Sequence, residues 1–236
     1  MKFFCVSGYH NVGKTSFILK FLEFLKKKKE TFAVIKSTHH KNILSSDITK
    51  DTSKFSQMGA DTALITPEEI FIEKRKNVIK KFSETQGIRY IIFKYFFSYD
   101  WVILEGFKNT ELPKLEVIKD VSDINFNLVN RLAFVINENL ANEEKQKELL
   151  EKLEQYFPKT PVFFFKDVEK IYEFLKEKLE SYRLKIFIDL KEIKLKPFVE
   201  NLFYNLLTTF LDSLKDTQGK SVEIFFEKRS NNDSQR

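Results

Sequence analysis

Short apolar runs alternate along the chain with longer segments in which apolar residues recur every three or four positions. The first run, Phe3–Val6, is typical of a buried strand, and the apolar face that begins at Phe17 predicts a helix after it. Runs of the same kind predict strands at residues 31–36, 61–66, 101–104, 114–118, 132–136 and 162–165. Helical spacing predicts further helices at residues 142–156 and 168–179. Strands that alternate with helices favour an α/β fold with a mostly parallel sheet flanked by helices.

Three segments of the N-terminal part are patterned less clearly. Residues 70–73 fit an edge strand, and residues 84–97 combine helical with strand character. Residues 37–54 are polar and have no hydrophobic period. A loop of that length inside a compact domain is more often functional than idle, so its polar side chains are candidate ligands.

The C-terminal part has a different pattern. Apolar residues occupy every second position over residues 184–190, all of them even-numbered. The next apolar residues, Ile193 and Leu195, occupy odd-numbered positions, and this change predicts a hairpin that turns near residues 189–192. Pro197 then begins a helical pattern, and residues 222–226 predict a final strand. We therefore expect a small ββαβ (α+β) module at residues 181–228, appended to a larger domain at residues 1–180, and a disordered tail at residues 229–236.

Composition limits the classes of protein that fit. The chain has 236 residues, of which 42% are hydrophobic and 15% aromatic, enough for a sizeable core and too many for global disorder. The net charge of +6 is spread along the chain, and its one basic run, Lys26–Lys29, falls where cations complement the end of the first helix. This distribution gives no support for a nucleic-acid partner.

The cysteine count and the apolar runs indicate the compartment. Cys5 is the single cysteine and lies on the first predicted strand, so a disulfide framework within the chain is excluded. The longest apolar stretch, residues 90–104, is interrupted by Lys94 and Asp100 and is too short to span a bilayer. We expect a soluble cytoplasmic protein without a membrane partner.

Residues 8–15 read Gly-Tyr-His-Asn-Val-Gly-Lys-Thr, a complete G-x-x-x-x-G-K-[ST] phosphate loop between a predicted strand and a predicted helix. The motif predicts a P-loop NTPase-like fold in which backbone N–H groups surround a phosphate at the start of the helix. Lys14 would reach the β- and γ-phosphates, and the Thr15 hydroxyl would bind Mg²⁺. The predicted nucleotide-binding residues are Gly8, Tyr9, His10, Asn11, Val12, Gly13, Lys14, Thr15 and Ser16.

The strand at residues 101–104 ends in an acid, as a Walker-B strand does. Glu105 is the predicted carboxylate that orients the water molecules of the metal ion, and the alternative is an ordinary exposed strand end. Gly106 would let the backbone pass close to the ligand. Asp100, at the other end of the strand, fits a cap better than a metal ligand.

The polar loop after the second strand offers histidines. His39 and His40 follow Lys36 closely, and His10, the third histidine of the chain, lies in the phosphate loop. Loops after the carboxyl ends of neighbouring parallel strands converge, so these side chains could contact phosphate or bind zinc, nickel or copper. The alternative is a pair of histidines on a surface loop.

Two carboxylates in the same loop are candidate metal ligands. Asp47 and Asp51 could hold Mg²⁺ directly or through water, whereas Asp51 could instead cap a short helix that begins near Thr52.

The sequence does not specify which base the nucleotide carries. Residues 137–140 lie where a guanine-reading Asn-Lys-x-Asp would stand, but they lack its lysine and aspartate, so the residues alone do not separate GTP from ATP.

These motifs together resemble those of the MobB family of P-loop GTP-binding proteins, the adaptors of molybdopterin-guanine dinucleotide biosynthesis. Beyond the phosphate loop, the resemblance lies in Lys36-Ser37-Thr38-His39-His40, Lys50-Asp51-Thr52, Met58-Gly59-Ala60, Glu105-Gly106-Phe107-Lys108 and Pro113-Lys114-Leu115-Glu116-Val117. Their order and spacing match over roughly residues 1–165. The resemblance implies GTP with Mg²⁺, slow hydrolysis at most, a homodimer, and assistance to the guanylyltransferase that attaches GMP to molybdopterin.

Two other functions are compatible with the phosphate loop. A small P-loop kinase would transfer the γ-phosphate, but it would need a lid of arginines, and the six arginines of this chain are scattered. A metallochaperone GTPase would deliver an ion through His39 and His40. We find no arginine finger in the sequence, which fits an adaptor that holds GTP and hydrolyses it slowly.

Overall fold

The computed structural model describes residues 1–37, 62–65, 70–73, 84–180, 184–188 and 191–214. The chain divides into two compact units, Met1–Ile193 and Lys194–Arg236. We describe each unit by itself. The domain boundary at residue 180 that the sequence suggested stays a prediction.

The first unit is built on a six-stranded sheet in the order β2-β5-β1-β6-β7-β8. Its strands are β1 (Lys2–Ser7), β2 (Phe32–Lys36), β5 (Trp101–Glu105), β6 (Lys114–Ile118), β7 (Arg131–Ile136) and β8 (Val162–Phe164). Every neighbouring pair is parallel. The predicted α/β class and mostly parallel sheet are confirmed. All six carboxyl ends therefore lie at one edge of the sheet.

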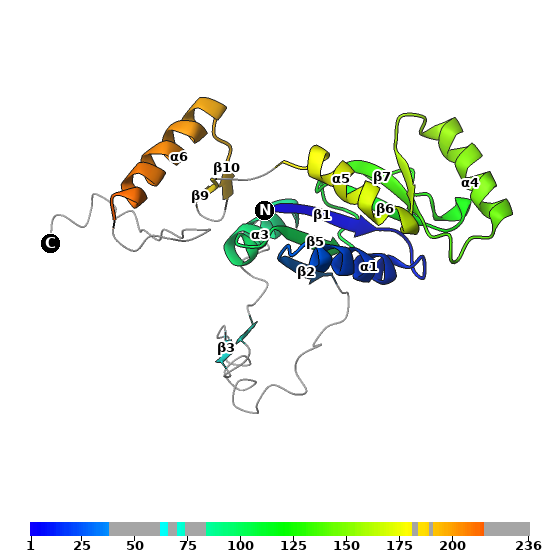
Figure 1. Ribbon diagram of the computed structural model, residues 1–236, viewed down its shortest axis with the longest axis horizontal. Helices are drawn as coiled ribbons and strands as arrows, with labels where there is room; N and C mark the ends of the chain where they lie inside the picture. The colour runs from blue at the N-terminus through cyan, green and yellow to red at the C-terminus, as the bar shows by residue number, and fades with distance from the viewer. Residues whose placement is uncertain (38–61, 66–69, 74–83, 181–183, 189–190, 215–236) are drawn as a thin grey trace. The chain divides into compact units, whose positions relative to one another are not determined.

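Helices cover both faces of this sheet (Figure 1). On one face, α1 (Lys14–Lys27) and α5 (Val168–Lys178) pack on alternate strand residues such as Phe4 and Ile103. On the other face, α3 (Glu84–Phe96) packs on Phe3 and Val102, and α4 (Glu143–Tyr156) packs on Phe134 and Ile136. Continuous burial of the central strands follows from this arrangement, because both faces of a parallel sheet are covered.

The described residues show how Cys5, Asn142 and Asp100 are placed. Cys5 is fully buried in β1, and burial raises the pKa of its thiol to about 12. Asn142 caps α4 by accepting a hydrogen bond from the backbone N–H of Lys145. The Asp100 carboxylate accepts hydrogen bonds from the backbone N–H and the hydroxyl of Thr31, so it joins the start of β5 to the start of β2.

Two antiparallel hairpins form separate two-stranded sheets. β3 (Thr62–Ile65) pairs with β4 (Ile70–Glu73), and β9 (Ile186–Ile188) pairs with β10 (Lys191–Ile193). Within residues 84–97, whose pattern was ambiguous, Glu84–Phe96 form the helix α3. The hairpin β9–β10 is joined to α3 by a hydrogen-bonded ion pair between Arg89 and Glu192, at 2.6 Å from Nε to Oε2.

The second unit contains the helix α6 (Pro197–Asp212), which begins at the proline that the sequence indicated. The predicted strand at residues 222–226 and the tail at residues 229–236 lie outside the described residues. Among the helices that the structure describes, none is both long and apolar enough to cross a membrane.

Candidate functional site

Three strand ends meet where the phosphate loop begins. β1 and β2 both flank β5, and the register pairs Val6 with Glu105 and Lys36 with Glu105. The chain leaves β1 at Ser7 and enters residues 8–13, whose backbone has positive φ at Gly8 (144°), Asn11 (59°) and Gly13 (96°). Left-handed residues in such a loop turn successive N–H groups to one side and form an anion-binding concavity.

Helix α1 begins directly after this loop with its first N–H groups available. Gly13 is its N-cap residue, no side chain among the described residues caps it, and its first turn contains no acidic residue. The helix dipole and these N–H donors favour an anion at this end. A phosphate is the anion that the loop motif predicts.

Lys14 lies folded over the loop. Its Nζ donates hydrogen bonds to the carbonyl oxygens of Gly8, at 3.2 Å, and Tyr9, at 2.6 Å. Burial is the main cause that lowers the pKa of Lys14; the Glu105 carboxylate opposes the shift, and the charge of Lys36 adds to it. The amine is therefore held at the mouth of the loop, where phosphate oxygens can replace the two carbonyls.

Thr15 and Glu105 are in direct contact. The Thr15 hydroxyl lies 3.2 Å from each oxygen of the Glu105 carboxylate, and Lys36 Nζ lies 3.3 Å from Oε1 of the same group. A hydroxyl and a carboxylate are oxygen donors of the kind that Mg²⁺ prefers. These two side chains therefore fit the magnesium site that the sequence predicted.

Gly106 follows Glu105 and connects the end of β5 to the end of β1. Its N–H donates to the Val6 carbonyl at 3.0 Å, and its φ of 99° is unfavourable for any residue with a Cβ. The Ser37 N–H donates to the Glu105 carbonyl at 3.1 Å. The ends of β1, β2 and β5 are thus held together around the Glu105 side chain.

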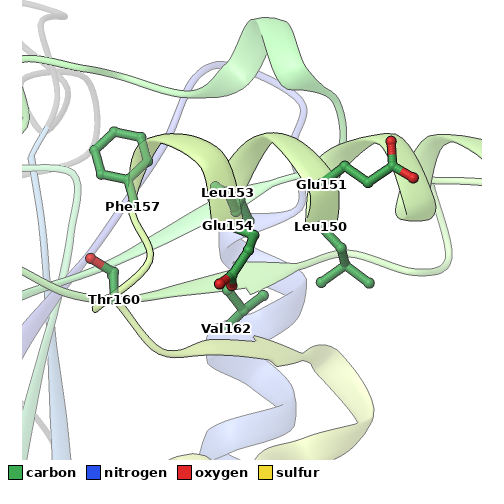
Figure 2. A pocket seen from close by; sticks show the side chains of 7 residues that line it. All are labelled: Leu150, Glu151, Leu153, Glu154, Phe157, Thr160 and Val162. Carbon is green, nitrogen blue, oxygen red and sulfur yellow. The ribbon is translucent and has the colours of Figure 1, made fainter.

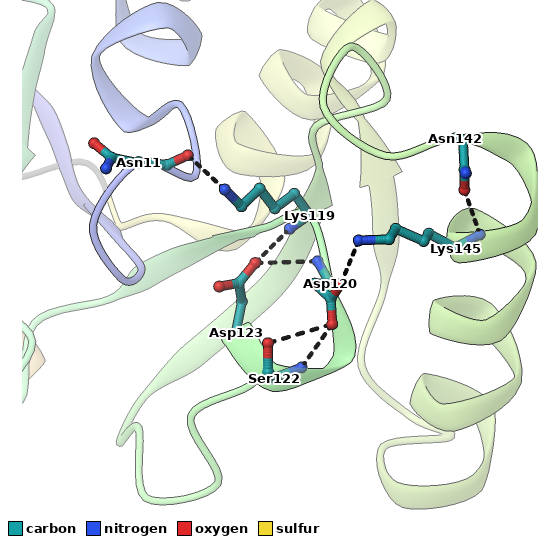
Figure 3. Close-up of polar contacts among 7 residues, drawn as sticks. All are labelled: Asn11, Lys119, Asp120, Ser122, Asp123, Asn142 and Lys145. Carbon is teal, nitrogen blue, oxygen red and sulfur yellow. Dashed lines mark hydrogen bonds and ion pairs between the residues drawn. The ribbon is translucent and has the colours of Figure 1, made fainter.

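Two further side chains reach the loop from the other side. Lys119, after β6, donates from Nζ to the Asn11 carbonyl at 3.2 Å (Figure 3). Asn137, after β7, donates from Nδ2 to the Val12 carbonyl at 2.9 Å. Lys119 was not identified from the sequence, and Asn137 was considered there only in relation to the base. Both directly follow parallel strands, which is the signal that could have identified them.

Over residues 3–138 the sequence matches the family described as MobB, molybdopterin guanine dinucleotide synthesis protein B. The chain belongs to the MobB family. Two solved structures of Bacillus subtilis MobB share the fold, with 20% and 21% sequence identity and a TM-score of 0.52 in each case. Each match covers 75% of this chain and 100% of the Bacillus subtilis chain. No curated protein sequence matches the chain.

The two charged side chains of the Pro-Lys-Leu-Glu-Val run, Lys114 and Glu116, are buried and stabilise neighbouring loops. Lys114 is fully buried, and its Nζ donates to the carbonyls of Thr110, Leu112 and Val129. The Glu116 carboxylate, also fully buried, accepts hydrogen bonds from Arg131 Nε and from the N–H of Asn125. These charged residues hold loops together and do not reach the phosphate loop.

An open pocket of about 660 Å³ lies elsewhere, between α4 and β8 (Figure 2). It is lined by Leu150, Glu151, Leu153, Glu154, Phe157, Thr160 and Val162. None of these residues belongs to the phosphate loop or was predicted as a site residue. The pocket therefore has no part in the candidate site.

The remaining predicted ligands are placed only in part. His10 is exposed in the phosphate loop, whereas His39, His40, Asp47 and Asp51 lie outside the described residues. Among the residues that are described, no group of three or more His, Cys, Asp or Glu side chains could hold a metal ion. The transition-metal site and the additional magnesium ligands stay predictions.

Proposed function

We propose that this chain is a GTP-binding adaptor that assists the guanylylation of molybdopterin in the synthesis of molybdopterin guanine dinucleotide. Membership of the MobB family gives the pathway. The observation that carries the proposal is the phosphate loop itself, because its left-handed residues, its uncapped helix and Lys14 are all arranged for a bound phosphate chain.

Mg²⁺ is the proposed companion of the nucleotide. Thr15 and Glu105 would hold it, because their oxygens are in contact beside the start of α1. The ion would supply positive charge to the phosphates, and Lys36 would remain as a second cation next to the Glu105 carboxylate. Asp47 and Asp51 are proposed as further ligands on the sequence pattern alone.

The two arginines within the described residues favour an adaptor over a kinase. Of the six arginines in the sequence, the structure describes Arg89 and Arg131. Arg89 forms an ion pair with Glu192, and Arg131 forms one with the buried Glu116. Because both support the fold, neither is placed to stabilise charge on a transferred phosphoryl group. We therefore propose slow hydrolysis at most, consistent with a protein that holds and presents its nucleotide.

The proposed partners are the guanylyltransferase of the pathway, molybdopterin, and a second copy of this chain. Reconstitution of the guanylyltransferase with molybdopterin, GTP and Mg²⁺ tests the proposal. Added wild-type protein is expected to accelerate formation of the dinucleotide, whereas Lys14→Met is expected not to. Lys20→Met is the matched control, because Lys20 is exposed on α1 beyond the loop. Equal rates with and without the wild-type protein would contradict the adaptor function.

A further inference from the structure

Two strand ends hold two consecutive peptide groups of the phosphate loop. Lys119 binds the carbonyl of Asn11, and Asn137 binds the carbonyl of Val12. The two donors come from β6 and β7, on the opposite side of β1 from Glu105 and Lys36. The loop is therefore held from a side where no nucleotide-binding residue was predicted.

Because the peptide group is planar, these contacts with carbonyl oxygens also fix the direction of the N–H groups that follow. In a planar trans peptide the carbonyl of one residue and the N–H of the next point in opposite directions. A hydrogen bond to the Asn11 carbonyl therefore sets the direction of the Val12 N–H. A hydrogen bond to the Val12 carbonyl sets that of the Gly13 N–H in the same way.

We propose that Lys119 and Asn137 are positioning residues that preorganise the phosphate loop for the phosphate groups of a nucleotide. By holding two carbonyls outward they keep the N–H groups of Val12 and Gly13 turned toward the anion before it binds. Asn11 and Gly13, two of the three loop residues with positive φ, flank these peptide groups and are the points at which this arrangement could otherwise relax. The proposal rests on the nucleotide-binding function proposed above.

Each anchor is itself fixed in place. Asn137 is buried, and its Oδ1 accepts the N–H of Asn139 at 3.2 Å, which leaves Nδ2 directed at the loop. A Cβ added to Gly13 would lie 2.3 Å from that Nδ2, so the loop and the amide are packed closely. The asparagine can therefore hold the loop without moving.

Lys119 is held through its backbone. The buried Asp123 carboxylate accepts the N–H groups of Lys119 and Asp120, each at 3.0 Å (Figure 3). The neighbouring Asp120 carboxylate is engaged separately, by Lys145 Nζ at 2.8 Å. Lys145 is thus a cation on the same side of the molecule that is paired with a carboxylate and makes no described contact with the loop.

The experiment compares Lys119→Met with Lys145→Met, since each replacement removes one positive charge. Hydrogen–deuterium exchange of the ligand-free proteins measures the order of the loop amides, and calorimetry with GTP and Mg²⁺ measures affinity. Lys119→Met is expected to accelerate exchange within residues 8–16 and to weaken binding about three- to tenfold, the effect of one hydrogen bond. Its unfolding temperature is expected to match that of Lys145→Met, and Lys119→Arg is expected to restore most of the affinity.

Repeating the affinity measurement at high salt separates the effect of the lysine charge from the effect of the lost hydrogen bond. A general electrostatic effect is screened at high ionic strength and would be shared by Lys145→Met, whereas loss of an anchor persists and is specific to Lys119. Asn137→Asp provides a second test, because it replaces the Nδ2 donor by an oxygen that repels the Val12 carbonyl. This variant is expected to weaken binding more than Lys119→Met does.

Unchanged exchange in Lys119→Met would overturn the proposal, and so would faster exchange without any loss of affinity. Failure of the wild-type protein to bind nucleotide would refute the proposed function instead. In that case the exchange measurement on the ligand-free proteins alone decides whether Lys119 orders the loop.

Discussion

The hydroxyl of Thr15 lies 3.2 Å from both oxygens of the Glu105 carboxylate. These residues are 90 positions apart in sequence and meet because β1 and β5 are parallel neighbours whose ends are in register. The contact joins the last residue of the phosphate-loop motif to the acid that ends the apolar strand. It brings together Thr15 and Glu105, two of the four magnesium ligands that the sequence predicted.

Glu105→Gln is expected to lower the affinity of the protein–nucleotide complex for Mg²⁺. The amide keeps the shape of the side chain but loses the charge that attracts the ion and its water molecules. We expect the magnesium affinity of the nucleotide complex to fall about 10- to 100-fold, as for other residues that support a metal. Titration of Mg²⁺ against a fluorescent GTP analogue measures it. Glu111→Gln, an exposed acid away from the loop, is the control; equal losses in both variants would contradict a role for Glu105.

Gly13→Ala and Gly106→Ala are expected to differ in severity. Both positions have positive φ, so each variant carries backbone strain of about 1 kcal/mol. At Gly13 the new Cβ would also lie 2.3 Å from Asn137 Nδ2, whereas at Gly106 its nearest neighbour would be the Ser37 Cβ at 3.5 Å. Gly13→Ala should therefore abolish nucleotide binding, and Gly106→Ala should lose about 1 kcal/mol of unfolding free energy. Urea denaturation with calorimetry compares them, and normal binding by Gly13→Ala would refute the loop geometry.

Arg131→Met is expected to destabilise the protein strongly. Arg131 Nε lies 2.6 Å from the fully buried Glu116 carboxylate. Burial raises the pKa of Glu116, although the charge of Arg131 lowers it. Without the arginine the carboxylate is buried and unpaired, and we expect a loss of about 3–5 kcal/mol in unfolding free energy. The double variant Arg131→Met with Glu116→Leu should recover much of this loss in urea denaturation. No recovery would show that the ion pair itself is required.

The contact of the β9–β10 hairpin with α3 is expected to depend on pH. Burial raises the pKa of Glu192, but its hydrogen bond and ion pair with Arg89, with the charge of Lys185, outweigh it and hold the pKa below the ordinary value of 4.5. A lowered carboxyl pKa gives stability that is present above the ordinary value and is lost as the pH falls through the pKa of the folded protein.

Glu192→Gln should therefore cost about 2 kcal/mol near neutral pH, the effect of hydrogen bonds to a charged group. The difference in unfolding temperature from the wild type should shrink as the pH falls below 4.5. Glu177→Gln, which removes an exposed acid paired with Lys178, serves as the control. A difference that stays constant down to pH 3 would contradict the coupling.

The sequence predicted the sheet and the phosphate loop because both are local patterns. The apolar runs marked all six strands of the sheet, and their alternation with helices implied parallel pairing. The spacing of Gly8, Gly13 and Lys14 marked the loop without knowledge of the fold. Pro197 likewise marked the start of its helix, because the preference of proline for the first helical turn is local.

What the sequence did not predict depends on contacts between distant segments. Lys119 and Asn137 carry no local motif, and their role is set by the order of β6 and β7 beside β1. The pattern of residues 84–97 was ambiguous because the apolar side chains of α3, such as Ile92, are buried by packing on β1 and β5. Lys114 and Glu116 matched a motif of the family, but the sequence did not show that they are buried or that they stabilise the fold.

Calorimetric titration of GTP and ATP with Mg²⁺ into the wild type and Lys14→Ala measures nucleotide binding by the phosphate loop. We expect micromolar binding of GTP and little binding of ATP. Binding should be lost in Lys14→Ala, because the Lys14 amine lies over the loop at the carbonyls of Gly8 and Tyr9. Preference for ATP would contradict the adaptor and favour a kinase. Absence of binding of either nucleotide would contradict the assignment of the loop as a nucleotide site.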